Sequence, residues 1–168
     1  MIVVSNTSTL ILLAKIDLLG IWREQVTNII IPPDVMHEVQ QKREEYDARL
    51  IAKYVQEGKI TIEKPALERV RAAIHSFRLD VGEAAAYALF NPKKHHALMT
   101  DDGELIKLCK LEGIPYIGAL AIVVWVWERQ KINTDTARDT IEKLRTIGRY
   151  RQDIITHFLS KLDVEESK

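Results

Sequence analysis

Acidic and amide side chains follow several short apolar runs of this sequence, at positions where parallel strands end or helices begin. They are Asn6, Glu38, Glu83, Asp101 and Asp102. Carboxylates that gather in one place repel one another unless a cation or a proton lies between them. Ligand sets made only of oxygen atoms select hard divalent ions, of which Mg²⁺ and Mn²⁺ are the usual choices. Because such ions activate water and stabilise the oxygens of an in-line phosphoryl displacement, the residues suggest a metal-dependent phosphodiesterase.

Each of these residues also has a purely structural interpretation. Asp80 and Glu83 have the spacing of a capping box, in which two side chains close the first turn of a helix. Either of the paired aspartates is placed to cap the helix that follows, and Glu38 is compatible with a solvated helix face. Asn6 is a common turn residue. Both interpretations stay open for each position, and convergence of the carboxylates in one cleft would favour the catalytic one.

The elements that must position these side chains alternate along the chain. Strands are expected at 2–4, 28–31, 60–62, 97–100 and 114–117, where short β-branched or apolar runs end at polar, proline or glycine residues. Helices are expected from residue 10, near 18–22, from residue 33, and at 46–57, 66–77, 80–90, 102–112, 119–130, 135–147 and 151–162. This alternation predicts an α/β fold around a parallel sheet with right-handed crossovers. The polar turn at 5–8 then lies at the carboxyl end of a strand, where open α/β folds bind ligands.

Length and composition favour one soluble domain. The 168 residues suit a single domain over 1–168, with a core over about 1–132 and a helical extension over about 133–168. Lys+Arg and Asp+Glu both number 24, so any nucleic-acid site must be a local patch. The single cysteine, Cys109, cannot form an internal disulfide, which fits a cytoplasmic protein. The apolar stretch 114–127 contains Pro115 and Gly118 and is too short to span a membrane comfortably.

A local patch of positive charge is present at 129–151, where seven Lys or Arg side chains outnumber three acids. Arg145, Arg149 and Arg151 surround Tyr150, whose ring can stack on a base beside residues that bind phosphate. A solvated helix face would equally explain the patch, and an antitoxin peptide or a second subunit could use it.

Around the acidic positions the sequence resembles PIN-domain proteins, and more narrowly a prokaryotic branch of predicted PIN nucleases. The similar segments are SNTSTLILLAKI at 5–16, IPPDVMHEV at 31–39, LDVGEAAA at 79–86, LMTDD at 98–102 and GIPYIG at 113–118. Their order and spacing extend the resemblance over about residues 2–132.

The resemblance implies a Rossmann-like three-layer α/β/α sandwich with a central parallel sheet, to which the C-terminal helices are added. It implies an endoribonuclease that uses Mg²⁺ or Mn²⁺ to cleave single-stranded or structured RNA. The positions that match the acidic metal ligands of the family are Glu38, Glu83 and Asp102, with Asp101 assisting Asp102 or taking its place. The positions that match the hydroxyl residues orienting the carboxylates or a water are Thr7, Ser8 and Thr100. Many such proteins are toxins with an antitoxin partner, and many are homodimers.

One position departs from the family pattern. Asn6 stands where the family has its first aspartate. An amide still offers a carbonyl oxygen to a metal, but the site loses one negative charge. Two functions therefore remain open: a nuclease attenuated by Asn6, or a catalytically inactive PIN-fold module that binds RNA or protein. A dinucleotide-binding enzyme is not supported, because no G-x-G-x-x-G or P-loop pattern follows an expected strand.

Overall fold

The computed structural model describes residues 1–166, and residues 167 and 168 of the predicted domain lie outside this part of the chain. A five-stranded sheet lies at the centre, in the order β3-β2-β1-β4-β5, and every pair of neighbours is parallel. The strands are β1 (Ile2–Ser5), β2 (Asn28–Ile31), β3 (Ile60–Ile62), β4 (Ala97–Met99) and β5 (Tyr116–Ile117). The predicted parallel α/β sheet is confirmed.

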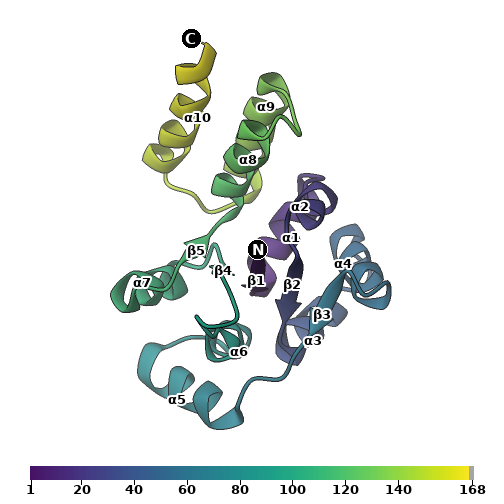
Figure 1. Cartoon of the computed structure of the whole chain (residues 1–168), viewed down its shortest axis with the longest axis vertical. Coiled ribbons are helices and arrows are strands. Elements are labelled where there is room, and N and C mark those ends of the chain that lie inside the picture. Colours follow the sequence, from purple (N-terminus) through teal and green to yellow (C-terminus); the bar gives the residue numbers. More distant parts are fainter. Residues whose placement is uncertain (167–168) are drawn as a thin grey trace.

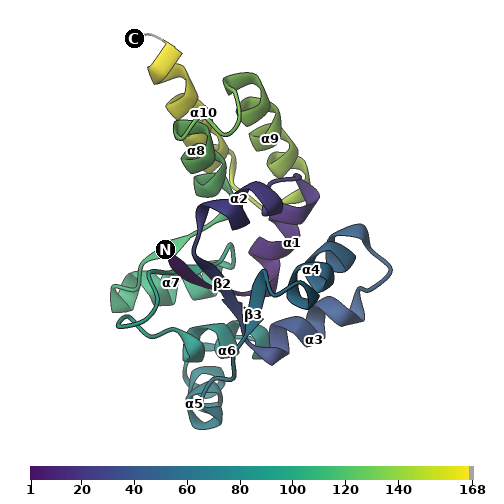
Figure 2. The same ribbon diagram turned by 45° about the vertical axis from the view of Figure 1, so that its right-hand side comes forward.

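Helices connect the strands and extend the chain beyond the last one. They are α1 (Thr7–Lys15), α2 (Leu19–Gln25), α3 (Pro33–Gln41), α4 (Tyr46–Gln56), α5 (Leu67–Phe77), α6 (Val81–Leu89), α7 (Gly103–Glu112), α8 (Ala119–Glu128), α9 (Thr134–Ile147) and α10 (Gln152–Glu166). Figures 1 and 2 show α5, α6 and α7 on a different side of the sheet from α1, α2, α3 and α4. None of the helices in residues 1–166 combines the length and the hydropathy needed to cross a bilayer.

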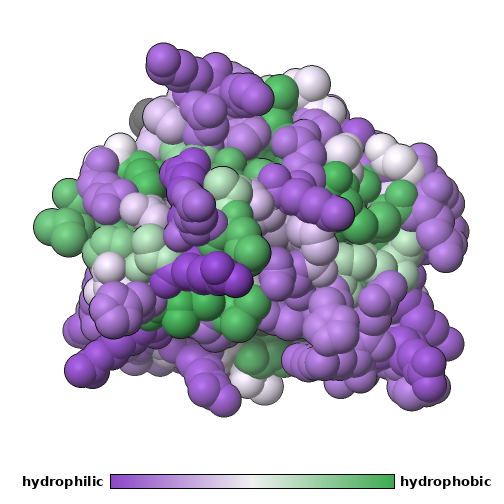
Figure 3. Space-filling view, turned by 90° about the horizontal axis from the view of Figure 1, so that it is seen from below, coloured by the Kyte–Doolittle hydropathy of each residue, from purple (hydrophilic) through white to green (hydrophobic). Residues whose placement is uncertain are grey.

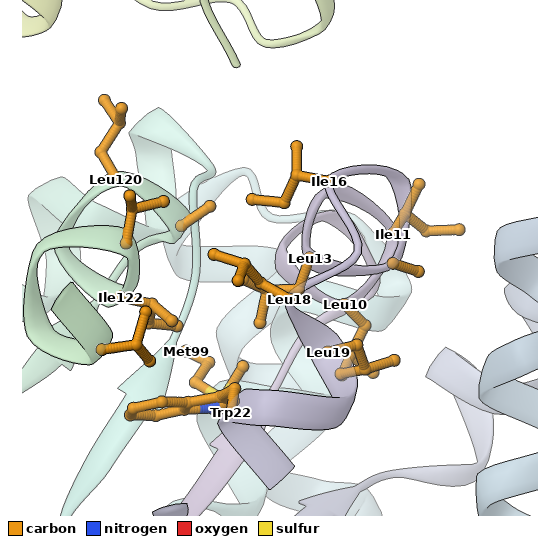
Figure 4. Close-up of a cluster of buried hydrophobic side chains, with 14 of the residues drawn as sticks. Leu10, Ile11, Leu13, Ile16, Leu18, Leu19, Trp22, Met99, Leu120 and Ile122 are labelled. Atoms are coloured by element: carbon orange, nitrogen blue, oxygen red, sulfur yellow. The ribbon is translucent and has the colours of Figure 1, made fainter. Parts of the chain in front are cut away.

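Two hydrophobic cores lie on the two faces of the sheet. Successive residues of a strand point to opposite faces, so Val3 packs in one core and Val4 in the other. The larger core joins the sheet to α1, α2 and α8, and Figure 4 shows Leu10, Trp22 and Ile122 gathered around Met99. The smaller core contains the alanine-rich α6 and the apolar side of α7. The three-layer sandwich is therefore confirmed.

The C-terminal helices form a hairpin that packs on α8. All sides of α8 are apolar, and α9 covers it with Ala137, Ile141 and Leu144, which are fully buried. Ile155 and Leu162 of α10 complete this packing. Figure 1 shows the segment that joins α9 to α10 at the end of the hairpin nearer the sheet. The hairpin is thus built onto the same hydrophobic core as the first helix.

Helix α1 begins earlier than the sequence pattern predicted. We expected a polar turn at 5–8 and a helix from residue 10, but the helix starts at Thr7. Asn6 is its N-cap, and the Asn6 side chain accepts a hydrogen bond from the Thr9 backbone N–H at 3.4 Å. A capping side chain of this kind lets a helix begin directly after a strand. Ser8 therefore lies in the first turn of a helix rather than in a loop.

Large apolar side chains that remain exposed are spread over several elements. Tyr46, Leu67, Val81 and Leu111 are each more than half exposed, and they belong to α4, α5, α6 and α7. Figure 3, which views the molecule from below, shows a mainly hydrophilic surface with separate hydrophobic patches.

Candidate active site

The site lies where the direction of strand addition reverses. The chain builds outward from β1 to β2 and β3, and then returns to place β4 on the other side of β1. Loops leaving β1 and β4 diverge at such a switch point and leave a crevice at the carboxyl ends of the strands. Asn6 follows β1, and Thr100 and the two aspartates follow β4. The topology therefore brings the first and fourth motifs of the sequence to one place.

Asn6 is held from all sides. Its backbone N–H donates to the Met99 carbonyl at 3.2 Å, and its side-chain Nδ2 donates to Thr100 Oγ1 at 2.9 Å. Its Oδ1 accepts from Ser8 Oγ at 3.1 Å, in addition to the capping bond described above. The residue is only 2% exposed. These contacts make Asn6 part of the wall between β1 and β4. The predicted role of Ser8 and Thr100 in orienting the carboxylates or a water stays a prediction.

A pocket of about 500 Å³ opens at this switch point. Its acidic and amide lining residues are Asn6, Glu38, Asp80, Glu83, Asp101 and Asp102. They come from four different stretches of the chain, at or next to α1, α3, α6 and α7. The sequence motifs therefore meet in one cleft, as the catalytic interpretation requires. We call Glu38, Glu83 and Asp102 the acidic floor of this pocket.

Glu38 reaches the pocket from α3. The Thr7 hydroxyl donates a hydrogen bond to Glu38 Oε2, which fixes the carboxylate beside the start of α1. The other side of the carboxylate lies against Gly82, where an added Cβ would come within 2.2 Å of Glu38 Oε1. Gly82 therefore leaves the space that the Glu38 carboxylate occupies. This contact explains a glycine in the first turn of α6, which is otherwise a poor helix residue.

Glu83 lies in the first turn of α6 and closes the predicted capping box. The Glu83 N–H donates to Asp80 Oδ1 at 2.8 Å, and the Asp80 N–H donates to Glu83 Oε2 at 3.1 Å. Partial burial, together with the nearby negative charge of Asp102, raises the pKa of Glu83 to about 7. The structural interpretation and the catalytic one are thus compatible, because the cap orients a carboxylate that still lines the pocket.

Asp102 is the N-cap of α7. Its Oδ1 accepts a hydrogen bond from the Leu105 N–H at 2.8 Å, and its own N–H donates to Thr100 Oγ1 at 3.0 Å. Thr100 therefore connects Asn6 and Asp102 through one hydroxyl oxygen. Of the two paired aspartates, Asp102 is the one whose charge reaches Glu83.

Asp101 is placed differently from its neighbour. Its Oδ2 accepts a hydrogen bond from Thr9 Oγ1 at 2.8 Å, and its Oδ1 accepts one from the Tyr150 hydroxyl at 2.6 Å. Both oxygens also accept from the Ala119 N–H at the start of α8, at 3.0 and 3.1 Å. Burial raises the pKa of Asp101, while these hydrogen bonds act in the opposite direction. We call Thr9, Asp101, Ala119 and Tyr150 the anchor cluster.

Three positively charged side chains line the same pocket. They are Lys15 at the end of α1, Lys42 directly after α3, and Arg149 between α9 and α10. We call these three residues the basic rim. Arg149 was predicted from the sequence but the two lysines were not, although their helical spacing from predicted site residues could have indicated them. Lys42 lies four residues after Glu38, and Lys15 lies seven after Ser8, so each shares a helix face with a site residue.

The other two arginines of the predicted RNA patch do not line the pocket. Arg145 forms an ion pair with Glu142 and donates to Gln152 Oε1 at 2.8 Å. Arg151 forms an ion pair with Asp153 at 3.0 Å. The structure therefore divides the predicted patch into Arg149 and Tyr150, which line the pocket, and two arginines that are paired outside it.

The donor atoms of the acidic floor suit a hard divalent cation, because all of them are oxygens. Burial is the main cause of the raised pKa of Glu83 and the negative charge of Asp102 adds to it, so a bound cation would favour the ionised form of Glu83. Within residues 1–166, no three His, Cys, Asp or Glu side chains are already spaced to hold an ion. Glu38 instead accepts a hydrogen bond from the Thr7 hydroxyl, and Glu83 accepts one from the Asp80 N–H. The carboxylates of the acidic floor thus line one pocket, but their oxygens do not converge on a single point.

Comparison with known proteins gives a family and a fold. The family DUF3368, described as a PIN domain, matches residues 2–164 of the chain. Among solved structures, PAE2754 from Pyrobaculum aerophilum is similar with a TM-score of 0.55 and 17% sequence identity. That match covers 75% of this chain and 98% of the other, and at this identity it supports the fold alone. No curated protein matches the sequence.

Proposed function

The chain belongs to the DUF3368 family of PIN domains, and from this membership we propose that it is a metal-dependent endoribonuclease attenuated by Asn6. The observation that carries the proposal is the convergence of Asn6 and the acidic floor in one pocket at the switch point of the sheet. A nuclease-type fold alone would not require these carboxylates to meet. Capping alone would not require Glu38, which caps no helix, to lie beside the two acids that do.

Glu38, Glu83, Asp102 and the Asn6 carbonyl oxygen are the residues that would hold Mg²⁺ or Mn²⁺. When bound, such an ion supplies an activated water for attack on phosphorus and stabilises the negative charge on the departing 3′ oxygen. The surrounding groups keep the ligands in place: the Thr7 hydroxyl holds Glu38, the Asp80 N–H holds Glu83, and Thr100 connects Asn6 to Asp102.

The basic rim supports RNA as the substrate. Its three cations border a pocket whose floor is acidic, so a phosphate chain can be bound at the edge while one phosphodiester faces the carboxylates. Lys15 lies roughly 10 Å along α1 from Ser8, at 1.5 Å per helical residue. That separation favours a substrate with more than one phosphate, such as an internal position of an RNA strand, over a single nucleotide.

The second candidate function is a PIN-fold module that binds RNA without cutting it. The observation in its favour is the hydrogen bonding of the Asn6 amide, whose Nδ2 donates to Thr100 and whose Oδ1 accepts from Ser8 and Thr9. Compared with an aspartate at this position, the neutral Asn6 side chain leaves one negative charge fewer for a cation, while its hydrogen bonds keep the local structure. An antitoxin partner, a homodimer and a cytoplasmic location remain predictions from the sequence.

Restoring the charge at position 6 separates the two functions. We expect Asn6→Asp to raise Mn²⁺ affinity about tenfold or more, because an additional charged ligand strengthens such sites. Cleavage of a fluorescent single-stranded RNA should rise in parallel and stop when EDTA is added. The control is Glu38→Gln in the Asn6→Asp background, which should not cut and so excludes a contaminating ribonuclease.

The outcomes distinguish the proposals clearly. Cleavage by the wild-type chain and faster cleavage by Asn6→Asp support the attenuated nuclease. Cleavage by Asn6→Asp alone means that the natural chain is the binding module on a nuclease scaffold. If neither form cuts with Mn²⁺ while both bind RNA, the enzyme proposal is wrong.

A further inference from the structure

One wall of the pocket comes from a distant part of the chain. Residues 147–150 all line the cavity beside the acidic floor, and they comprise the last residue of α9 and most of the segment that joins α9 to α10. This wall reaches the floor from the C-terminal hairpin, whose joining segment lies at the sheet end of the hairpin (Figure 1).

Tyr150 fastens the segment to the sheet. Its hydroxyl donates to Asp101 Oδ1 at 2.6 Å, and its half-buried ring packs against the larger hydrophobic core. Burial and the nearby charge of Asp101 raise the pKa of Tyr150, so the phenol remains a hydrogen-bond donor at any physiological pH. Both ends of the side chain are thus engaged within the protein. The base-stacking role that the sequence suggested for Tyr150 stays a prediction.

Two glycines leave the space for this contact. A Cβ at Gly118 would lie 2.7 Å from Asp101 Oδ1, and a Cβ at Gly148 would lie 2.2 Å from the Tyr150 ring. A larger residue at either position would separate the segment from the start of α8 or displace the ring. Because Asp101 also accepts hydrogen bonds from Thr9 and Ala119, the anchor cluster joins the segment to α1, β4 and α8 together.

Arg149 is the group that this arrangement presents to the pocket. It lies between Gly148 and Tyr150, so the anchor fixes its backbone while its side chain remains exposed at the rim. Among the described residues it has no ion-pair partner, in contrast to Arg145 and Arg151 on either side. A guanidinium group binds a phosphate through two parallel hydrogen bonds, which requires a fixed position as well as charge.

We infer that Tyr150 is a positioning residue which, through Asp101, places Arg149 to bind a phosphate of the substrate strand next to the acidic floor. The inference rests on the proposed function, since it names how the RNA is held at that same pocket. It also assigns Asp101 to substrate positioning rather than to the metal.

A double-mutant cycle on RNA binding tests the inference. Binding of a fluorescein-labelled single-stranded RNA is measured by anisotropy in EDTA, so that no cleavage occurs. Arg149→Ala should weaken binding about tenfold, as expected for a charged hydrogen bond, and Tyr150→Phe should weaken it about threefold or more. In the Arg149→Ala background, Tyr150→Phe should have no further effect, because it acts through the missing arginine. Lys143→Ala, which removes an exposed lysine of α9 outside the pocket, is the matched control and should change nothing.

Limited digestion with trypsin tests the anchor without RNA. Trypsin cuts after arginine, and Arg149 lies inside the segment, so cleavage reports how often the segment leaves the wall. We expect Tyr150→Phe to be cut at Arg149 several times faster than wild type, while the Lys143→Ala control is cut at the wild-type rate. Mn²⁺ affinity should be unchanged in Tyr150→Phe.

Each result has a definite meaning. Additive effects of the two substitutions on RNA binding, or a loss of Mn²⁺ affinity in Tyr150→Phe, would overturn the positioning role. Equal digestion rates would show that the hydroxyl does not hold the segment. If the wild-type chain binds no RNA at all, the proposed function and the phosphate role of Arg149 both fail, whereas the digestion still decides whether Tyr150 is an anchor.

Discussion

Asp101 and Asp102 are neighbours in the sequence, but Asp101 belongs to the anchor cluster and Asp102 to the acidic floor. The two regions differ in how many hydrogen-bond donors surround the carboxylate. In the anchor cluster, Asp101 accepts hydrogen bonds from two hydroxyls and a backbone N–H, which satisfy both of its oxygens. In the acidic floor, Asp102 accepts one capping bond and otherwise lies beside another carboxylate. The two aspartates therefore differ in the number of donors around them, although they share a residue type and a motif. This difference is the basis for proposing a structural role for Asp101 and a cation-binding role for Asp102.

The largest effects should come from substituting the two aspartates. Asp102→Ala should mainly lower Mn²⁺ affinity, whereas Asp101→Ala should mainly lower the free energy of unfolding. Asp102→Ala should lower Mn²⁺ affinity about 100-fold, since a charged ligand is worth several kcal/mol to a bound ion. Its free energy of unfolding in EDTA should fall by only about 1 kcal/mol, the usual value of a lost helix cap. Asp101→Ala should instead cost about 3 kcal/mol of stability, because it leaves several buried donors unpaired, and should change Mn²⁺ affinity less than about threefold.

Calorimetric titration with Mn²⁺ and urea denaturation measure the two quantities separately. Asp101→Asn is a matched control, because it retains one acceptor oxygen and should lose less stability than Asp101→Ala. A similar loss of Mn²⁺ affinity in both aspartate variants would contradict the distinction between the two regions.

The pH dependence of metal binding should be an intermediate effect confined to the acidic floor. Glu83 has a pKa of about 7 in the folded protein, above the ordinary value of 4.5. A proton on this carboxylate competes with the cation, so Mn²⁺ affinity should rise about tenfold between pH 6 and pH 8. The same raised pKa means that Glu83 favours the metal-free fold below about pH 4.5 and loses this contribution as the pH rises through 7. Glu83→Gln should remove both dependences; a slope that persists in this variant would assign the titration to another group.

The smallest effects should come from the basic rim lysines, which belong to neither region. Lys15→Ala and Lys42→Ala should each weaken RNA binding severalfold and reduce the slope of log affinity against log salt by about one. Neither should alter Mn²⁺ affinity or the free energy of unfolding. RNA titrations at several salt concentrations provide the measurement, and an unchanged slope would mean that the lysine contacts no phosphate.

The fold could be predicted well from the sequence because its signals are local. The five strands are short apolar runs that stop at polar, proline or glycine residues, and most predicted helices agree with the structure to within two residues. The start of α1 was wrong because Asn6, Thr7 and Ser8 are turn-forming residues as well as capping ones. The predicted strand at 114–117 proved to be only Tyr116–Ile117, after a turn stabilised by a left-handed Gly113.

The site could be predicted only in part, because its contacts are not local. The acidic floor was found from motifs, each adjacent to the end of a strand or the beginning of a helix. The anchor cluster was not, since the hydrogen bond from Tyr150 to Asp101 joins residues 49 positions apart. Gly118 and Gly148 marked the relevant turns in the sequence, but what each glycine makes room for is visible only when the partner side chain is in place.

The late position of Tyr150 also sets the order in which the pocket is completed. A ribosome translates the segments that carry Asn6, Glu38, Glu83 and Asp102 well before the α9–α10 segment emerges from its exit tunnel. A nascent chain can therefore assemble the sheet while the wall that carries Arg149 is still missing. Arg149 and Tyr150 are therefore the last of the pocket-lining residues to be synthesised.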